Sequence, residues 1–248
     1  MNEQRKGRVL ACSDLHGRKD LFDKINAILE EDDEVIFCGD AADRGYDGWE
    51  IIKAMISDPR WTYVRGNHDD MLIKAAHHYF RTGSYGRDYS LLRSNGGKHT
   101  FEDMKHDPDN KEWIQLLNGF PTYEVYHNAM GKTVVCSHAG FTPWKDDSGC
   151  LLIPEDEDLI WDRSHFLDEW DSKEMHENVI CVHGHTSVIH LLEDLTYIDV
   201  EDDFVDDPTI LTYCQGHKIA IDLLSAYTGK VVLLDLDTLT PIYIKAEE

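Results

Sequence analysis

Residues that commonly bind metals occur at five separate points of this 248-residue chain, each directly after an apolar stretch. The apolar stretches, residues 8–12, 34–38, 61–64, 133–136 and 179–182, are short and rich in β-branched residues, which predicts strands. Ligands of open α/β sheets bind just beyond the carboxyl ends of the strands, so we expect the five points to converge on one pocket. They are SDLHG (Asp14, His16), GDAADRG (Asp40, Asp43), RGNHDD (Asn67, His68), SHAG (His138) and HGHTS (His185).

The combination of carboxylate, amide and imidazole side chains favours divalent ions such as manganese, iron or zinc. The set is large enough for two ions. Two ions about 3.5–4 Å apart activate water and bind phosphoryl oxygens. The sequence therefore predicts a two-metal hydrolase that acts on phosphate esters.

Each motif also has an ordinary structural interpretation. Asp14 could cap the following helix, and GDAADRG could be an acidic turn with a surface arginine. In the functional interpretation, Arg44 binds a phosphate oxygen with its planar fork, and Asp43 orients a histidine. His68 is suited to protonating a leaving alkoxide. The order, spacing and ligand types of all five motifs agree, which favours the functional interpretation.

The composition restricts the class of protein. A formal charge of −24 disfavours binding to nucleic acids and anionic membranes, and 42% hydrophobic residues suffice for a large core. The length suits one α/β domain over residues 1–248. Six cysteines without a CxxC pair indicate reduced core thiols and a cytoplasmic location. We expect neither a signal peptide nor a membrane span.

Helical periodicity follows the first three strands, at residues 21–29, 49–56 and 71–76, as in a layered α/β fold. The more polar segment of about 82–118 predicts a helical cap or insertion over the site. Later segments predict more β-structure. Residues 219–223 and 230–236 resemble a hairpin around Thr228-Gly229, and 242–244 follows as a further strand. The acidic stretch within about 193–212 predicts a solvated loop, with metal binding as the less favoured alternative.

Taken together, the motifs resemble the phosphoprotein phosphatase family of calcineurin-like metallophosphoesterases, in its bacterial and phage branch. They follow D-x-H-G, G-D-x-x-D-R-G, G-N-H-[DE], H-A-G and G-H-T, and they span Asp14 to Thr186. The resemblance implies a four-layer αββα sandwich with two mixed sheets. It also implies hydrolysis by a hydroxide that bridges two divalent ions, for which we expect manganese, with iron or zinc as alternatives.

The resemblance implies roles for individual residues. It implies two metal sites that share one carboxylate, with the ligands Asp14, His16 and Asp40 for one ion and Asp40, Asn67, His138 and His185 for the other. It implies a general acid, His68, that is paired with Asp43. It also implies an arginine clamp for the phosphoryl group, formed by Arg44, Arg65 and Arg163, the last in Ile160-Trp161-Asp162-Arg163.

Two sequence details bear on the branch. The arginine of Asp43-Arg44-Gly45 is typical of phosphoprotein phosphatases, whereas related nucleases and phosphodiesterases usually carry G-H-x-H where this chain has Gly184-His185-Thr186-Ser187. Bacterial members usually carry I-x-I-D-T-G, and this chain reads Ile219-Ala-Ile-Asp222-Leu-Leu. The substrate contacts made there therefore differ.

Three functions stay open on the sequence. The favoured one is a serine/threonine protein phosphatase, with dual specificity as a variant and a phosphorylated protein or small molecule as substrate. The alternative is a symmetrical diadenosine tetraphosphate hydrolase, because residues 138–143 read H-A-G-F-T-P, similar to that subfamily's H-A-G-I-x-P. A non-catalytic metal-binding module is disfavoured because every ligand and His68 are present. No pattern indicates an oligomeric state.

Overall fold

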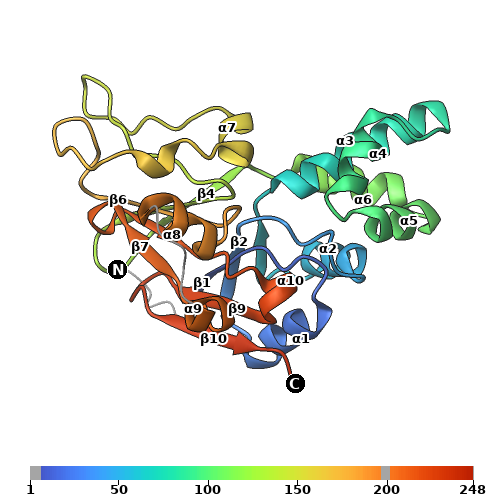
Figure 1. The fold of residues 1–248 in the computed structure, drawn as a ribbon, viewed down its shortest axis with the longest axis horizontal. Coiled ribbons are helices and arrows are strands. Elements are labelled where there is room, and N and C mark those ends of the chain that lie inside the picture. The colour runs from blue at the N-terminus through green and yellow to red at the C-terminus, as the bar shows by residue number, and fades with distance from the viewer. Residues whose placement is uncertain (1–6, 197–201, 248) are drawn as a thin grey trace.

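Ten strands form two five-stranded sheets in the computed structural model, which describes residues 7–196 and 202–247 (Figure 1). Sheet A has the order β10-β9-β1-β2-β3 and sheet B the order β4-β5-β6-β8-β7. The strands are β1 (Val9–Cys12), β2 (Glu34–Phe37), β3 (Trp61–Tyr63), β4 (Tyr123–His127), β5 (Thr133–Ser137), β6 (Val179–His183), β7 (Leu211–Tyr213), β8 (Lys218–Ala220), β9 (Lys230–Asp235) and β10 (Pro241–Lys245). The five strands predicted before the motifs are thus confirmed as β1, β2, β3, β5 and β6.

Both sheets are mixed. In sheet A, β1 pairs in parallel with β2 and β2 with β3, whereas β9 is antiparallel to both β1 and β10. In sheet B, β5, β6 and β8 are parallel and the outer strands β4 and β7 are antiparallel. The parallel strands are β1, β2 and β3 in sheet A and β5, β6 and β8 in sheet B. Because they are parallel, their carboxyl ends lie at the same edge of each sheet.

Helices follow the first three predicted strands, at the positions where the apolar periodicity changes to that of a helix. In α1, for example, Leu21, Phe22 and Ile25 are buried on one face, and Pro59 lies just after the end of α2. The helices are α1 (Lys19–Ile28), α2 (Gly48–Ser57), α3 (Asn67–Thr82), α4 (Arg87–Ser94), α5 (Lys98–His106), α6 (Asn110–Gly119), α7 (Asp156–Trp161), η1 (His165–Leu167), α8 (Val188–Thr196), α9 (Asp202–Asp206), η2 (Cys214–Gly216) and α10 (Ser225–Thr228).

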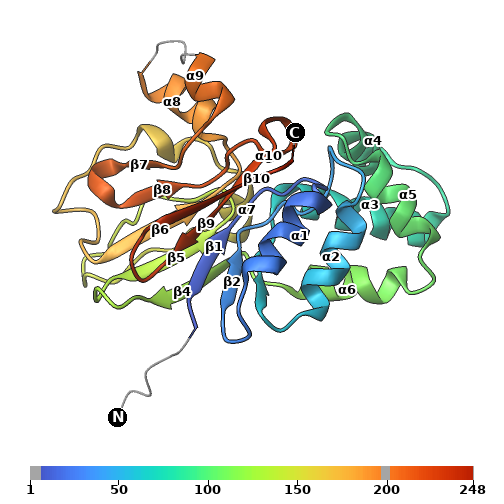
Figure 2. The ribbon, with the colours of Figure 1, turned by 90° about the horizontal axis from the view of Figure 1, so that it is seen from below.

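The side chains of β1 alternate between two cores. Leu10 and Cys12 pack among the residues of α1 and α2, whereas Val9 and Ala11 pack against sheet B. Burying one such aliphatic side chain stabilises the fold by roughly 1.5–3 kcal/mol. Figure 2 shows the resulting succession of sheet B, sheet A and a helical layer. The central strands are therefore apolar on both faces.

The fourth layer covers the outer face of sheet B. Val135, Val179 and Cys181 of that face pack against Phe141 and against Leu159 of α7. The chain is therefore an α/β protein with the four-layer αββα sandwich that the resemblance implies. Among the described residues, no helix is long and apolar enough to cross a membrane.

The predicted hairpin around Thr228-Gly229 is wrong. β8 lies in sheet B beside β6, whereas β9 lies in sheet A between β1 and β10. Ile219 and Leu234 belong to the same core between the sheets, so the two segments meet face to face instead of edge to edge. An apolar alternation predicts a strand but not its partner. The short helix α10 carries the chain from one sheet to the other, and the true hairpin is β9–β10.

The sequence predicts helices in the polar segment 82–118 and a loop in the acidic segment 193–212. Most of residues 82–118 forms α4, α5 and α6, which lie beside α3 at one side of the molecule in Figure 1. The acidic stretch of about 193–212 is not simply a loop, because α8 continues to Thr196 and α9 occupies Asp202–Asp206. Residues 197–201 of that stretch lie outside the described part of the chain.

Candidate metal centre

Six side chains predicted as metal ligands meet just beyond the ends of β1, β2, β3, β5 and β6. We name them the ligand cluster: Asp14, His16, Asp40, Asn67, His138 and His185. Asp40 is central, since its Oδ2 lies 3.4 Å from His138 Nε2 and 3.9 Å from His16 Nε2. Asn67 Oδ1 lies 2.9 Å from His138 Nε2 and 3.2 Å from His185 Nδ1. All six are buried, so their contacts are shielded from solvent.

Backbone carbonyls orient two of the imidazoles. His16 Nδ1 donates to the carbonyl of Ala42 at 2.9 Å, and His138 Nδ1 donates to that of Cys38 at 2.8 Å. In a neutral ring this leaves Nε2 with a lone pair directed into the cluster. Metal-binding histidines are usually held in this way by a hydrogen bond at the other nitrogen.

The donor set fits a cation. Asn67 Oδ1 and Asp40 Oδ2 lie 2.9 Å and 3.4 Å from His138 Nε2, so these three ligand atoms converge. Asp14 Oδ1 is buried and has no hydrogen-bond partner among the described residues. Buried acceptors that face each other are unfavourable unless a positive charge lies between them. Asp14, Asp40 and His138, and separately His16, Asp40 and His68, can each direct ligand atoms at one ion.

The carboxylates of Asp40 and Asp14 create a negative field at His138. Burial lowers the pKa of His138, but Asp40 and Asp14 outweigh it and raise the pKa to about 9. Burial, and then the neighbouring Asp222, hold the pKa of Asp14 well above its usual range. The same field would stabilise divalent cations.

The backbone of the site is strained. Ten non-glycine residues among those described have positive φ, and six belong to the predicted site: Asp14 (53°), His16 (46°), Asp40 (64°), Asp43 (72°), Arg44 (62°) and His185 (66°). The left-handed region is costly for residues with a Cβ, and such strain concentrates at functional sites. This is evidence for the site that is independent of side-chain chemistry.

His68 and Asp43 form a buried pair beside the ligand cluster. His68 Nδ1 lies 2.8 Å from Asp43 Oδ2, and its Nε2 lies 3.9 Å from Asp40 Oδ2. Burial lowers the pKa of His68, but Asp40 and Asp43 outweigh it, so the pKa is raised overall. Because Nδ1 is in contact with Asp43, Nε2 is the ring nitrogen that faces the ligand cluster.

The three predicted arginines are placed differently. Arg163 donates from Nη1 to Thr186 Oγ1 at 2.6 Å, directly beside His185 in the chain. Arg44 is exposed and lines a surface hollow. Arg65 donates from Nε to the carbonyl of Phe120 at 2.9 Å. Among the hydrogen bonds and ion pairs of the described residues, none joins the Arg65 side chain to the ligand cluster.

Asp69 is a site residue that sequence reasoning did not single out. Its Oδ2 accepts from Asp40 N at 3.1 Å and from Gly66 N at 2.9 Å, and its Oδ1 accepts from Tyr63 Oη at 2.9 Å. Burial, and then Asp40, raise the pKa of Asp69 to about 7. It joins the ends of β2 and β3. Its position three residues after Gly66, typical of a capping acid at a helix start, was the available signal.

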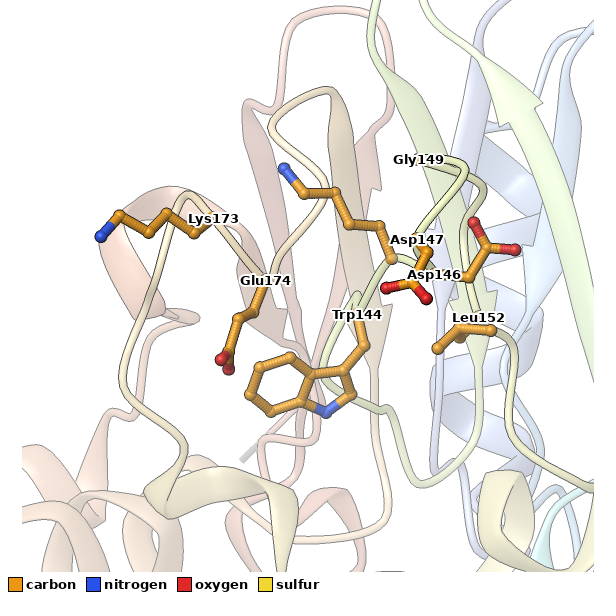
Figure 3. A pocket seen from close by; sticks show the side chains of 8 residues that line it. Trp144, Asp146, Asp147, Gly149, Leu152, Lys173 and Glu174 are labelled. Atoms are coloured by element: carbon orange, nitrogen blue, oxygen red, sulfur yellow. The ribbon is translucent and has the colours of Figure 1, made fainter.

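Two surface hollows differ in their relation to the cluster. One of about 720 Å³ is lined by Arg44, by the α4–α5 turn and by His190 and Tyr227, so it borders one of the predicted site residues. Another of about 600 Å³ lies between two loop segments and is lined by residues such as Trp144 and Glu174 (Figure 3). It contains no predicted site residue.

Metal loading is expected to stabilise the fold. A ligand at about 100 times its Kd stabilises a folded protein by about 2.7 kcal/mol. At roughly 2–4 °C per kcal/mol for a chain of this size, Mn²⁺ should raise the Tm by about 5–10 °C, and EDTA should reverse the shift. Thermal unfolding of chelator-treated protein with and without Mn²⁺ measures it. An identical Tm under both conditions would argue against a metal centre.

Comparisons with known proteins identify the relatives of this fold. The family profile described as calcineurin-like phosphoesterase matches residues 7–234. The crystal structure of a candidate diadenosine tetraphosphatase has a TM-score of 0.61 and 16% identity, covering 98% of this chain and 95% of that chain. A protein serine/threonine phosphatase from Saccharomyces cerevisiae, similar to human PP5, has a TM-score of 0.57 and 12% identity, covering 100% and 82%.

The cold-active protein-tyrosine phosphatase of a psychrophilic Shewanella species has a TM-score of 0.54 and 18% identity, covering 97% of this chain and 80% of that chain. A sequence search of curated proteins finds no match. At these identities the structural likenesses show the fold alone. The fold and the family match define a hydrolase of the dinuclear metallophosphatase class. The chain belongs to the calcineurin-like phosphoesterase family, whose members use two divalent metals.

Proposed function

We propose that this protein is a serine/threonine protein phosphatase of the bacterial and phage branch, formed by one domain over residues 1–248. The observation that carries the proposal is the buried His68–Asp43 pair beside the ligand cluster, with the exposed Arg44 next to Asp43 in the chain. An acid next to a phosphoryl-binding arginine is what release of a poor alkoxide leaving group requires. Dual specificity toward phosphotyrosine is a variant of the same proposal.

Six residues of the chain would bind the two metal ions. Asp14, His16 and Asp40 would hold one ion, and Asp40, Asn67, His138 and His185 the other. Two divalent ions, with manganese favoured over iron or zinc, would supply Lewis acidity toward water and phosphoryl oxygens.

The protein's own groups would handle the phosphoryl and the proton. Arg44 and Arg163, with Arg65 if its side chain turns inward, would neutralise charge on the phosphoryl oxygens. His68 would donate the proton on Nε2 to the departing oxygen. Asp43 would keep Nδ1 protonated and hold the ring in place, since the two are in hydrogen-bond contact at 2.8 Å.

A symmetrical diadenosine tetraphosphate hydrolase is the second candidate. The H-A-G-F-T-P stretch at 138–143 favours it, and the solved structures similar to this chain include a candidate diadenosine tetraphosphatase beside a serine/threonine phosphatase. The hollow at Arg44 has room for either leaving group at about 720 Å³. Substrate preference therefore has to be measured.

Two parallel assays separate the candidate functions. The purified protein with Mn²⁺ is given phosphoserine and phosphothreonine peptides in one assay and diadenosine tetraphosphate in another, and products are separated by chromatography. We expect inorganic phosphate from the peptides and little ADP. Rapid formation of ADP, without phosphate from the peptides, would transfer the assignment to the tetraphosphatase.

We also propose that the protein is located in the cytoplasm. All six cysteines are free, which suits a reducing compartment. The charge of −24 makes nucleic acid and anionic membranes poor partners, so a phosphorylated protein or small molecule is the proposed substrate.

A further inference from the structure

The turn that carries Asp43 and Arg44 is stabilised by residues from another segment of the chain. Both residues are left-handed, with φ of 72° and 62°, so the turn is not the conformation that these residues prefer in isolation. A conformation of this kind persists only where the surroundings determine it. The contacts that determine it should therefore also set the direction of the Asp43 carboxylate.

The helical segment around the α4–α5 turn supplies two of these contacts. The Arg44 backbone N–H donates to the carbonyl of Gly96 at 3.3 Å, and the Asp43 backbone N–H donates to Thr100 Oγ1 at 3.1 Å. Thr100 is on α5, 57 residues further along the chain, and it is fully buried. Two successive N–H groups of the strained turn thus depend on acceptors from this segment.

The start of α5 packs so closely against the Asp43 turn and against α2 that a larger residue than glycine would clash at two positions. A Cβ on Gly97 would lie 2.7 Å from Asp43 Oδ1, and a Cβ on Gly48 of α2 would lie 2.9 Å from Thr100 Oγ1. Asp43 Oδ1 is itself buried and has no hydrogen bond that the described residues provide. Burial raises the pKa of Asp43, and the hydrogen bond with His68 opposes that rise. Thr100 thus acts on Asp43 through its hydrogen bond with the Asp43 backbone N–H.

We propose that Thr100 is a positioning residue, whose hydroxyl holds the Asp43 backbone so that the carboxylate meets His68 Nδ1 and keeps the acid in line. The inference rests on the proposed acid role of His68 and goes beyond it, because it gives the helices between β3 and β4 a part in the chemistry. A threonine that only fills space would act through packing, and valine would replace it without loss.

The test uses leaving groups that differ in their need for an acid. Phenyl phosphate requires protonation of its leaving oxygen, whereas 2,4-dinitrophenyl phosphate does not. Losing one hydrogen bond is worth about 1 kcal/mol, so Thr100→Val should lower kcat for phenyl phosphate roughly 5- to 10-fold. For dinitrophenyl phosphate the change should stay within about twofold, and KM should hold for both, because the acid acts on the leaving oxygen alone. Thr100→Ser should restore the rate.

Thr82→Val is the matched control, because its hydroxyl is exposed on α3 and bonds only to local groups of the same segment. It should leave kcat and KM unchanged for both substrates. Equal losses on both substrates with Thr100→Val, or no rescue by serine, would overturn the inference in favour of a packing role. Full activity of Thr100→Val on phenyl phosphate would overturn it as well.

A double-mutant cycle and an NMR measurement provide two further tests. In an Asp43→Asn background, Thr100→Val should have no additional effect on phenyl phosphate, because the two substitutions act on one interaction; additive losses would contradict this. In metal-free protein, the NMR signal of the His68 Nδ1 proton should shift or exchange faster in Thr100→Val and return in Thr100→Ser. If His68→Ala itself shows no dependence on the leaving group, the acid assignment fails and this inference with it. If the rate loss depends on the leaving group in His68→Ala but not in Thr100→Val, the acid assignment stands and the positioning role of Thr100 fails.

Discussion

Replacing Asp40 with asparagine is expected to lower kcat/KM on the order of 10²–10³-fold or more, which is the typical effect of removing one preorganised electrostatic group at a reacting centre. Asp40 Oδ2 is the carboxylate oxygen closest to His138 Nε2, at 3.4 Å, and it also faces His16 and His68. The amide oxygen could still accept from the His68 backbone N–H, as Asp40 Oδ1 does at 2.9 Å. The loss would therefore be one of charge and metal affinity, with the fold retained.

Elemental analysis together with kinetics tests this expectation. The variant should bind fewer than two ions per chain under conditions that saturate the wild type. Asp23→Asn makes the same chemical change on the exposed side of α1, where the side chain is 59% accessible, and should leave both quantities unchanged. Two bound ions and wild-type turnover in Asp40→Asn would remove Asp40 from the proposed centre.

His68→Ala is expected to lower kcat by roughly 10²–10⁴-fold for substrates with poor leaving groups, since this is the range for loss of a positioned general acid. For a good leaving group such as dinitrophenolate the decrease should be much smaller. The physical reason is that the acid stabilises charge on the departing oxygen, and dinitrophenolate carries that charge without help. Steady-state rates on phosphoserine peptide and on 2,4-dinitrophenyl phosphate measure the difference.

His77→Ala provides the matched control, because His77 is exposed on the same helix α3. It should behave as wild type on both substrates. Unchanged turnover of the peptide by His68→Ala would transfer the acid role to another group. A uniform decrease on both substrates would indicate that His68 acts through the metal ligands and not on the leaving oxygen.

Much of the fold follows from local pattern. The apolar runs before Asp14, Asp40, Asn67, His138 and His185 are strands, and the periodic segments after the first three are helices. Strand and helix periodicities are properties of a few neighbouring residues, so they can be read along the chain. The common position of the ligands also follows, because parallel strands present their carboxyl ends at one edge.

Partner choice required the tertiary structure. The segments that become β8 and β9 have the same apolar alternation, yet they lie in different sheets and face each other across the core. The energy that separates these arrangements comes from packing between distant segments, which no local pattern encodes. The same is true of Arg65, whose side chain is tied to the carbonyl of Phe120 although its motif resembles that of a phosphate clamp.

The chemical types of the site residues were thus determined by the sequence itself, as carboxylates, amide and imidazoles at strand ends. Only the tertiary structure decided which ring nitrogen faces the cluster, which residues adopt positive φ, and that Thr100 and Gly96 hold the turn of Asp43 and Arg44. Residue type and spacing are properties of the covalent chain. Orientation depends on hydrogen bonds between segments that are far apart in the chain, and these exist only once both sheets and their helices have packed together.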